Sequence, residues 1–140
     1  NVLADKAENY KNVEVVHMVS LTESRYAEKI ENFHHNALFA GNSTRKFISK
    51  GIADYTPSFF YEIPKLFDEI LPVDVALIQV SSPDEHGFVS LGVSVDYTLK
   101  AAKRAKILIA QINKNMPRTL GDSFLHLDDI DFIVKKDEKL

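Results

Sequence analysis

The 140-residue chain has the length of a single domain, so one hydrophobic core is expected. With 45% hydrophobic and 26% charged residues it has the composition of a folded protein, and a net charge of -3 without a basic stripe argues against nucleic-acid binding. Zero cysteines exclude disulfides and thiolate sites, and the apolar runs are too short to cross a membrane, so the cytoplasm is the expected location.

The first half of the chain alternates short apolar runs with helical patterns. Because the chain starts at Asn1 in the middle of such a pattern, we interpret it as a fragment. From the N-terminus we expect the end of a helix at 2–11, a strand at 13–19, a helix or irregular segment at 22–36, a buried strand at 37–41, a helix at 43–51 closed by Gly51, and an edge strand or turn at 53–57. An imperfect capping box of Thr22 and Arg25 opens the segment 22–36.

The second half continues the alternation. We expect a helix at 57–70 interrupted at Pro64, a strand at 73–81, a strand at 88–94, a helix at 96–105, a strand at 106–112 and a last strand at 131–136. The strand 73–81 is apolar on both faces, as in a parallel sheet covered by helices. The pattern therefore predicts one α/β domain over residues 1–140, with a mainly parallel sheet flanked by helices.

Two polar segments follow buried strands, where open α/β sheets bind their ligands. In the first, GNSTR, Gly41 ends a strand and Asn42, Ser43 or Thr44 can cap the next helix, leaving free N–H groups beside Arg45. An anion would fit there. The simpler alternative is a strand, a turn and a capped helix without a ligand.

The second segment is SSPDEHGFVSLG, residues 81–92. A turn needs two or three polar or special residues, whereas this loop has five in a row, among them Asp84, Glu85, His86 and Gly87. The alternatives are a bare turn with solvent-facing charges or a loop that faces a binding site. Because both segments follow strands interpreted as parallel neighbours, we expect them at the same edge of one sheet.

Other features favour structural roles. The pair at His34 and His35 cannot place both rings on one helix face, and no ligand spacing indicates a metal site. His17 lies in an apolar strand, which favours a half-buried histidine over a ligand. The sequence has no nucleotide-binding or serine-hydrolase motif.

Four stretches together resemble the acetyl-CoA hydrolase/transferase family, in particular its butyryl-CoA and 4-hydroxybutyrate CoA-transferases. They are GNSTR, ADYTPSFFYEIPKLF, LPVDVALIQVSSPDEHGFVSLGVSVDYT and MPRTLGDSFLHLDDIDFIV. The resemblance spans nearly all of residues 13–134. Small departures, such as Ser82 where a second proline is common, concern substrate preference.

The resemblance implies a CoA-transferase-like fold of the NagB/RpiA/CoA-transferase type, of which this chain is part of the N-terminal half. It further implies transfer of CoA between a short-chain acyl-CoA and a carboxylic acid such as acetate, through a glutamyl-CoA thioester. The nucleophilic glutamate lies in the C-terminal half, so the chain holds no catalytic nucleophile and should be inactive alone. Coenzyme A is a substrate, and no permanently bound cofactor is implied.

The residues that the resemblance places at the substrate are Asn42, Arg45, Asp84, Glu85, His86, Gly87 and Ser90. The implied partners are an acyl-CoA, a short-chain carboxylate, the C-terminal half of the enzyme and further copies in a homo-oligomer. Two alternatives stay open. One is an acyl-CoA hydrolase of the same family, and the other is a stand-alone binding module without catalysis.

Overall fold

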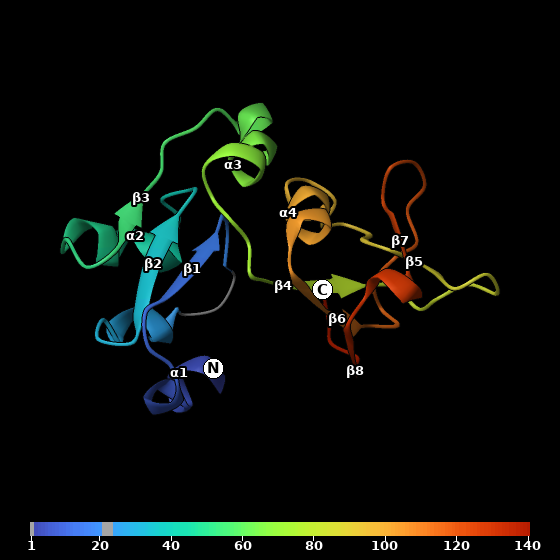
Figure 1. Ribbon diagram of the computed structural model, residues 1–140, viewed down its shortest axis with the longest axis horizontal. Coiled ribbons are helices and arrows are strands. Elements are labelled where there is room, and N and C mark those ends of the chain that lie inside the picture. The colour runs from blue at the N-terminus through green and yellow to red at the C-terminus, as the bar shows by residue number, and fades with distance from the viewer. Residues whose placement is uncertain (1, 21–23) are drawn as a thin grey trace. The chain divides into compact units, whose positions relative to one another are not determined.

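The computed structural model describes residues 2–20 and 24–140 (Figure 1). The chain divides into two compact units, Asn1–Phe60 and Tyr61–Leu140. Each unit has its own cluster of buried hydrophobic side chains, so the expected single core is replaced by two. Among the helices of these described residues, none has the length and hydrophobicity that a membrane span needs.

The first unit is built on a parallel sheet with the strand order β1-β2-β3. Its elements are α1 (Val2–Asp5), the 3-10 helix η1 (Ala7–Asn9), β1 (Val13–His17), the 3-10 helix η2 (Arg25–Glu28), β2 (Phe33–Ala37), α2 (Asn42–Ser49) and β3 (Asp54–Tyr55). The prediction of an edge strand near 53–57 is confirmed by β3.

Of the two alternatives for the segment 22–36, the described residues 24–32 show the irregular one, with a single 3-10 turn at 25–28. The strand β2 runs from Phe33 to Ala37, so the buried strand expected at 37–41 was placed four residues too late. Phe33 and His35 are buried and His34 is exposed, which is the alternation of a strand and puts the two histidines on opposite faces. Thr22, the first residue of the capping box, lies outside the described residues.

The second unit holds a parallel sheet of order β4-β6-β8 and an antiparallel pair β5-β7. After the 3-10 helix η3 (Phe60–Glu62) its elements are α3 (Ile63–Glu69), β4 (Val75–Val80), β5 (Phe88–Ser90), α4 (Thr98–Arg104), β6 (Ile107–Ile112), β7 (Phe124–His126), η4 (Leu127–Asp129) and β8 (Phe132–Lys135). Pro64 lies in the first turn of α3, where a proline is tolerated, so it starts this helix and does not interrupt it.

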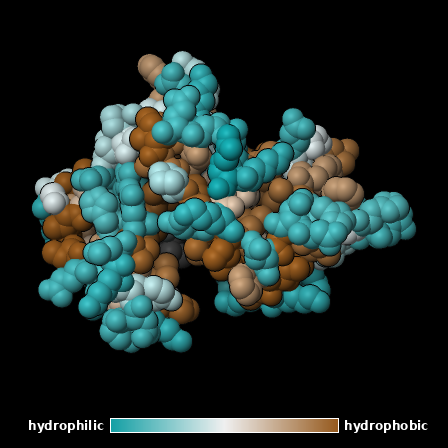
Figure 2. Space-filling view, viewed as in Figure 1, coloured by the Kyte–Doolittle hydropathy of each residue, from teal (hydrophilic) through white to brown (hydrophobic). Residues whose placement is uncertain are grey.

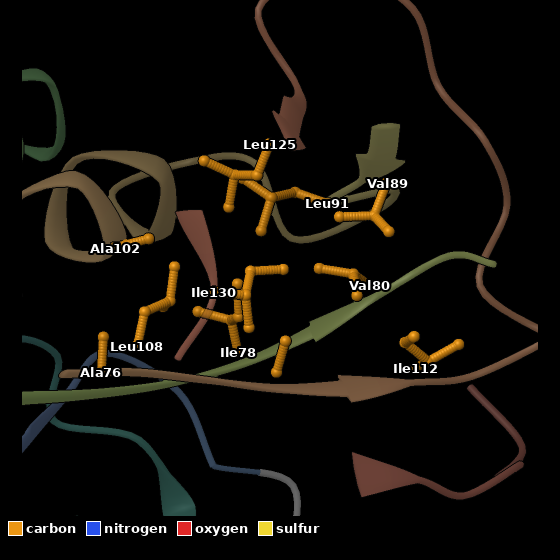
Figure 3. Close-up of a cluster of buried hydrophobic side chains, with 11 residues drawn as sticks. Ala76, Ile78, Val80, Val89, Leu91, Ala102, Leu108, Ile112, Leu125 and Ile130 are labelled. Atoms are coloured by element: carbon orange, nitrogen blue, oxygen red, sulfur yellow. The ribbon is translucent and has the colours of Figure 1, made fainter. Parts of the chain in front are cut away.

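The main core lies on one face of β4 and β6 (Figure 3). Alternate residues of the two strands point toward α4, β5 and β7, and the resulting cluster of buried residues is Ala76, Ile78, Val80, Val89, Leu91, Ala102, Leu108, Ala110, Ile112, Leu125 and Ile130. Helix α4 contributes Ala102, and α3 contacts α4. The predicted class, α/β with parallel sheets flanked by helices, is confirmed.

Two details of this unit were not predicted. On the opposite face of β4 the apolar side chains of Val75 and Leu77 are exposed, although they were expected to be covered by helices. The strand expected at 88–94 ends at Ser90 and pairs antiparallel with β7.

The strands β2 and β4 belong to different sheets. The expectation that the segments after these two strands lie at the same edge of one sheet is therefore wrong.

Candidate functional site

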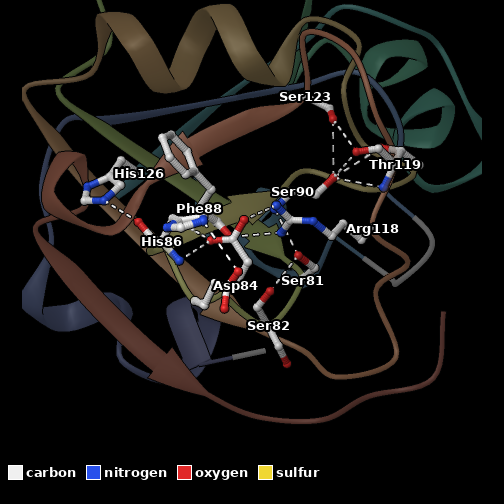
Figure 4. Close-up of polar contacts among 11 residues, drawn as sticks. Ser81, Ser82, Asp84, His86, Phe88, Ser90, Arg118, Thr119, Ser123 and His126 are labelled. Atoms are coloured by element: carbon white, nitrogen blue, oxygen red, sulfur yellow. Dashed lines mark hydrogen bonds and ion pairs between the residues drawn. The ribbon is translucent and has the colours of Figure 1, made fainter.

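The loop after β4 is a closed turn whose backbone bonds to itself (Figure 4). The N–H of Asp84 donates to the oxygen of Phe88 at 2.9 Å, and the N–H of Gly87 donates to the oxygen of Asp84 at 3.1 Å. Gly87 has a φ of 82°, which residues with a side chain rarely adopt. A Cβ at this position would also approach Nε2 of His126 to 2.8 Å. Glycine is therefore strongly favoured at this position of the turn.

The side chain of Asp84 organises the loop from within. Its Oδ1 accepts the N–H of Phe88 at 2.8 Å and that of His86 at 3.0 Å, while its Oδ2 forms an ion pair with Arg118 at 2.5 Å. The N–H of Phe88 first, then that of His86 and the charge of Arg118, hold the pKa of Asp84 below its usual value. Asp84 is thus a charged structural anchor.

Glu85 and His86 stand at the tip of the loop. Their side chains are 86% and 75% exposed, and Oε1 of Glu85 lies 3.5 Å from Nε2 of His86. The backbone oxygen of His86 lies 3.0 Å from Nε2 of His126, which ties the tip to β7. These two side chains are the most exposed ionisable groups of the loop.

Ser90 lies in β5 and is fully buried. Its hydroxyl accepts the N–H groups of Gly92 and Thr119, both at 3.1 Å, and lies 3.4 Å from the hydroxyl of Ser123. The structure therefore shows Ser90 as a support that joins β5 to the segment 116–123. Its role in substrate binding stays a prediction.

The segment GNSTR lies in the first unit, at the start of α2. The cap residue is Gly41, and no side chain caps the helix, contrary to the capping role considered for Asn42, Ser43 and Thr44. Thr44 is buried and its hydroxyl bonds to the oxygens of Phe39 and Gly41, both at 3.3 Å. Asn42 and Arg45 are exposed, and Arg45 donates to the oxygen of Ala40 at 3.2 Å.

The structure thus gathers five predicted site residues in the second unit and leaves Asn42 and Arg45 in the first. It adds Arg118 and His126, which bond to the loop from 34 and 40 residues away, and Thr119, which bonds to Ser90 from 29 residues away. Nothing in the local pattern around these residues indicated chemistry. They lie within the stretch MPRTLGDSFLHLDDIDFIV, so the resemblance to the family was the signal that pointed to this segment.

Among the residues that the structure describes, no three His, Asp or Glu side chains form a set that could hold a metal ion. An open hollow of about 540 Å³ lies in the first unit, and none of the predicted site residues lines it. Its lining residues are Ala4, Asp5, Ala7, Glu8, Arg25, Lys29, Glu31 and Asn32.

The parallel sheets, with helices beside them and a polar loop at the carboxyl end of β4, make this an α/β protein. In open sheets of that class, ligands commonly bind at strand ends. The chain belongs to the acetyl-CoA hydrolase/transferase family, because the sequence model of the Acetyl-CoA hydrolase/transferase N-terminal domain matches residues 1–140.

Characterised relatives agree with this assignment. The chain is 55% identical to the 4-hydroxybutyrate coenzyme A transferase of Clostridium kluyveri over 143 residues, which cover 100% of this chain and 33% of that protein. It is 30% identical to the butyryl-CoA:acetate CoA-transferase of Anaerostipes caccae, covering 95% of this chain and 31% of that protein. The fold matches the crystal structure of RipA from Yersinia pestis with a TM-score of 0.87 and 27% identity, over 99% of this chain and 35% of that one. The chain therefore spans about a third of the length of these relatives.

Proposed function

We propose that the full-length protein is a CoA-transferase that moves CoA between a short-chain acyl-CoA, butyryl or 4-hydroxybutyryl, and a carboxylic acid such as acetate. The observation that carries this proposal is the 55% identity to a 4-hydroxybutyrate CoA transferase over the whole chain. A loop that holds Glu85 and His86 exposed at the end of β4 supports it, because such a loop can contact a substrate.

The proposed chemistry divides one transfer into two steps. A glutamate carboxylate outside this chain attacks the thioester carbonyl, and the CoA thiolate leaves as a mixed anhydride forms. The thiolate then attacks the glutamyl carbonyl of the anhydride, which releases the acyl group as its carboxylate and leaves a glutamyl-CoA thioester. An incoming carboxylic acid reverses the sequence, so each thioester broken is matched by one formed.

The proposed task of this chain is to position the substrate and to exclude water that would hydrolyse the intermediates. Glu85 and His86 are the groups that we expect to contact the substrate, with Asn42 and Arg45 as further contacts. Coenzyme A serves as a substrate, without a permanently bound cofactor. The C-terminal half of the enzyme, a homo-oligomeric assembly and a cytoplasmic location belong to the same proposal.

Changing Glu85→Gln in the full-length enzyme tests the role of the loop. This substitution keeps the size and removes the charge, so we expect turnover of butyryl-CoA and acetate to fall roughly 10- to 1000-fold, the range of a lost positioning or acid–base contribution. Glu69→Gln, at the exposed end of α3, is the control and should leave turnover unchanged.

Trapping of the intermediate with hydroxylamine or borohydride completes this test. We expect the Glu85→Gln enzyme still to form the glutamyl-CoA thioester. Complete loss of trapping with CoA binding intact would place the nucleophile in this chain and contradict the mechanism. If the enzyme hydrolyses the acyl-CoA to free CoA and the free acid when no acceptor acid is present, the protein is a hydrolase instead.

The 140-residue chain by itself should not transfer CoA, because the proposed nucleophile lies elsewhere. Assay of the purified chain with butyryl-CoA and acetate checks this expectation. Turnover of about 1 s⁻¹ or faster, an ordinary rate for an enzyme, would contradict it.

A further inference from the structure

Arg118 is placed to hold the loop 84–88 at both of its ends (Figure 4). Its Nη2 donates to Oδ2 of Asp84 at 2.5 Å, and its Nη1 donates to the backbone oxygen of Phe88 at 2.9 Å. The guanidinium also lies over the ring of Phe124, 4.6 Å from its centre. One side chain therefore bridges the first and last residues of the loop from a different segment.

The position of Arg118 is itself fixed by its neighbours. The N–H of Thr119 donates to the buried hydroxyl of Ser90 at 3.1 Å, and Oγ1 of Thr119 donates to the oxygen of Gly92 at 3.0 Å. Gly92 has a φ of 59°, and a Cβ there would lie 2.7 Å from the oxygen of Pro117. The backbone next to Arg118 is thus packed directly on the end of β5.

The planar, forked shape of the guanidinium accounts for the contacts of Arg118. Arginine presents its N–H groups in a planar array that can bond two acceptors at once and stack on an aromatic ring. Lysine at position 118 would keep the charge beside Asp84, but its single ammonium cannot keep the stacking on Phe124 and the bond to Phe88 in the same geometry.

We infer that Arg118 is a positioning residue of the proposed transferase, which acts by fixing the loop so that Glu85 and His86 are presented to the substrate. This inference rests on the proposed function. The groups of Arg118 are taken up by Asp84, Phe88 and Phe124, so its effect on the reaction passes through the loop. Without it, the loop would sample conformations in which its tip is misplaced.

The test compares Arg118→Gln and Arg118→Lys with a matched control in the full-length enzyme. Arg104 is the control because it also forms an ion pair with an aspartate of the same unit, Asp68, and lies on α4 away from the loop. We expect Arg118→Gln to lower kcat/KM about 10- to 100-fold, Arg118→Lys to recover part of the loss, and Arg104→Gln to stay within about twofold of the wild type.

Two readouts separate positioning from general destabilisation. The Kd for CoA and the circular dichroism spectrum should be the same in Arg118→Gln and Arg104→Gln. Amide hydrogen exchange at His86 and Phe88, whose N–H groups bond to Asp84, should speed up at least about tenfold in Arg118→Gln alone.

The outcomes are distinct. If kcat/KM of Arg118→Gln stays within twofold of Arg104→Gln, the positioning role is overturned. If hydrogen exchange at His86 and Phe88 is unchanged in Arg118→Gln, Arg118 does not hold the loop in place. If the wild-type enzyme transfers no CoA but the exchange differs as expected, the proposed function fails while the bridge between Arg118 and the loop stands.

Discussion

His35 lies in the middle of β2 with no exposed surface, next to two other polar rings. The hydroxyl of Tyr26 is 2.7 Å from Nε2 of His17 and 3.4 Å from Nε2 of His35, and the two imidazole rings are 4.6 Å apart. Burial, with smaller contributions from His17 and His34, lowers the pKa of His35 to about 4. Burial also lowers the pKa of His17 and raises that of Tyr26 to about 12.

These shifts make the stability of the first unit depend on pH. Above the ordinary histidine pKa of 6.5, His35 is neutral in both the folded and the unfolded chain and contributes nothing. Below that pH the unfolded chain takes up a proton and the folded chain does not, until the pH reaches about 4. Stability therefore falls as the pH falls through this window, by about 3 kcal/mol for His35 in total.

Replacing His35→Leu tests this dependence at the scale of one residue. Between pH 7 and 5 the urea midpoint of the wild-type chain should decrease, and the decrease should be smaller in His35→Leu because one titrating group is gone. Phe33→Leu, a change at a buried residue of the same strand that carries no titrating group, should keep the wild-type slope. Equal slopes in all three proteins would show that His35 does not titrate as its burial requires.

At the scale of the elements, Asn113 joins three segments of the second unit. Its side chain is fully buried directly after β6. Nδ2 donates to Oε1 of Gln79 at 3.1 Å and to the oxygen of Glu138 at 2.9 Å, and Oδ1 accepts the N–H groups of Asn115 and Glu138. One amide thus ties β4 and the residues after β8 to the end of β6.

Asn113→Ala should lower the free energy of unfolding by about 3 kcal/mol, because it removes the four hydrogen bonds that this buried amide makes, each of them worth about 1 kcal/mol. Asn115→Ala removes one exposed bond to the oxygen of Glu138 and should cost about 1 kcal/mol or less. Urea unfolding measures both. Hydrogen exchange at the amide of Glu138 gives a second readout and should become faster in Asn113→Ala. Unchanged exchange there would show that Asn113 does not hold the residues after β8.

The elements also show where prediction from the sequence succeeds. Strands β4 and β6 were predicted nearly to their ends, because long apolar runs between polar boundaries have few other interpretations. The strand β2 was expected at 37–41 but spans Phe33–Ala37, because the exposed His34 and the buried His35 look alike in a sequence and hide the alternation of a strand. The partnership of Arg118 with Asp84 spans 34 residues, and only the folded backbone brings them together.

At the scale of the whole molecule, the outer face of the sheet β4-β6-β8 carries exposed apolar side chains. Cross-strand register puts Val75 beside Ile107, Leu77 beside Ile109, and Ile109 beside Phe132 on this face. Leu77 is 66% exposed and Phe132 59%, and Figure 2 shows further patches of hydrophobic side chains among hydrophilic ones on the visible surface. Parallel sheets are ordinarily covered on both faces. Since the relatives are about three times as long, we expect the full-length protein to cover this face.

The substitution Leu77→Ser tests whether the full-length protein covers this face of the sheet. In the 140-residue chain we expect this change to reduce self-association, seen by light scattering, while the free energy of unfolding changes by no more than about 0.5 kcal/mol. In the full-length protein the same change should cost about 2 kcal/mol or more, because it would place a hydroxyl in a buried apolar contact. Leu108→Ser, buried on the opposite face, should destabilise both proteins alike. If Leu77→Ser is neutral in the full-length protein as well, this face is exposed there, and its apolar side chains have another role.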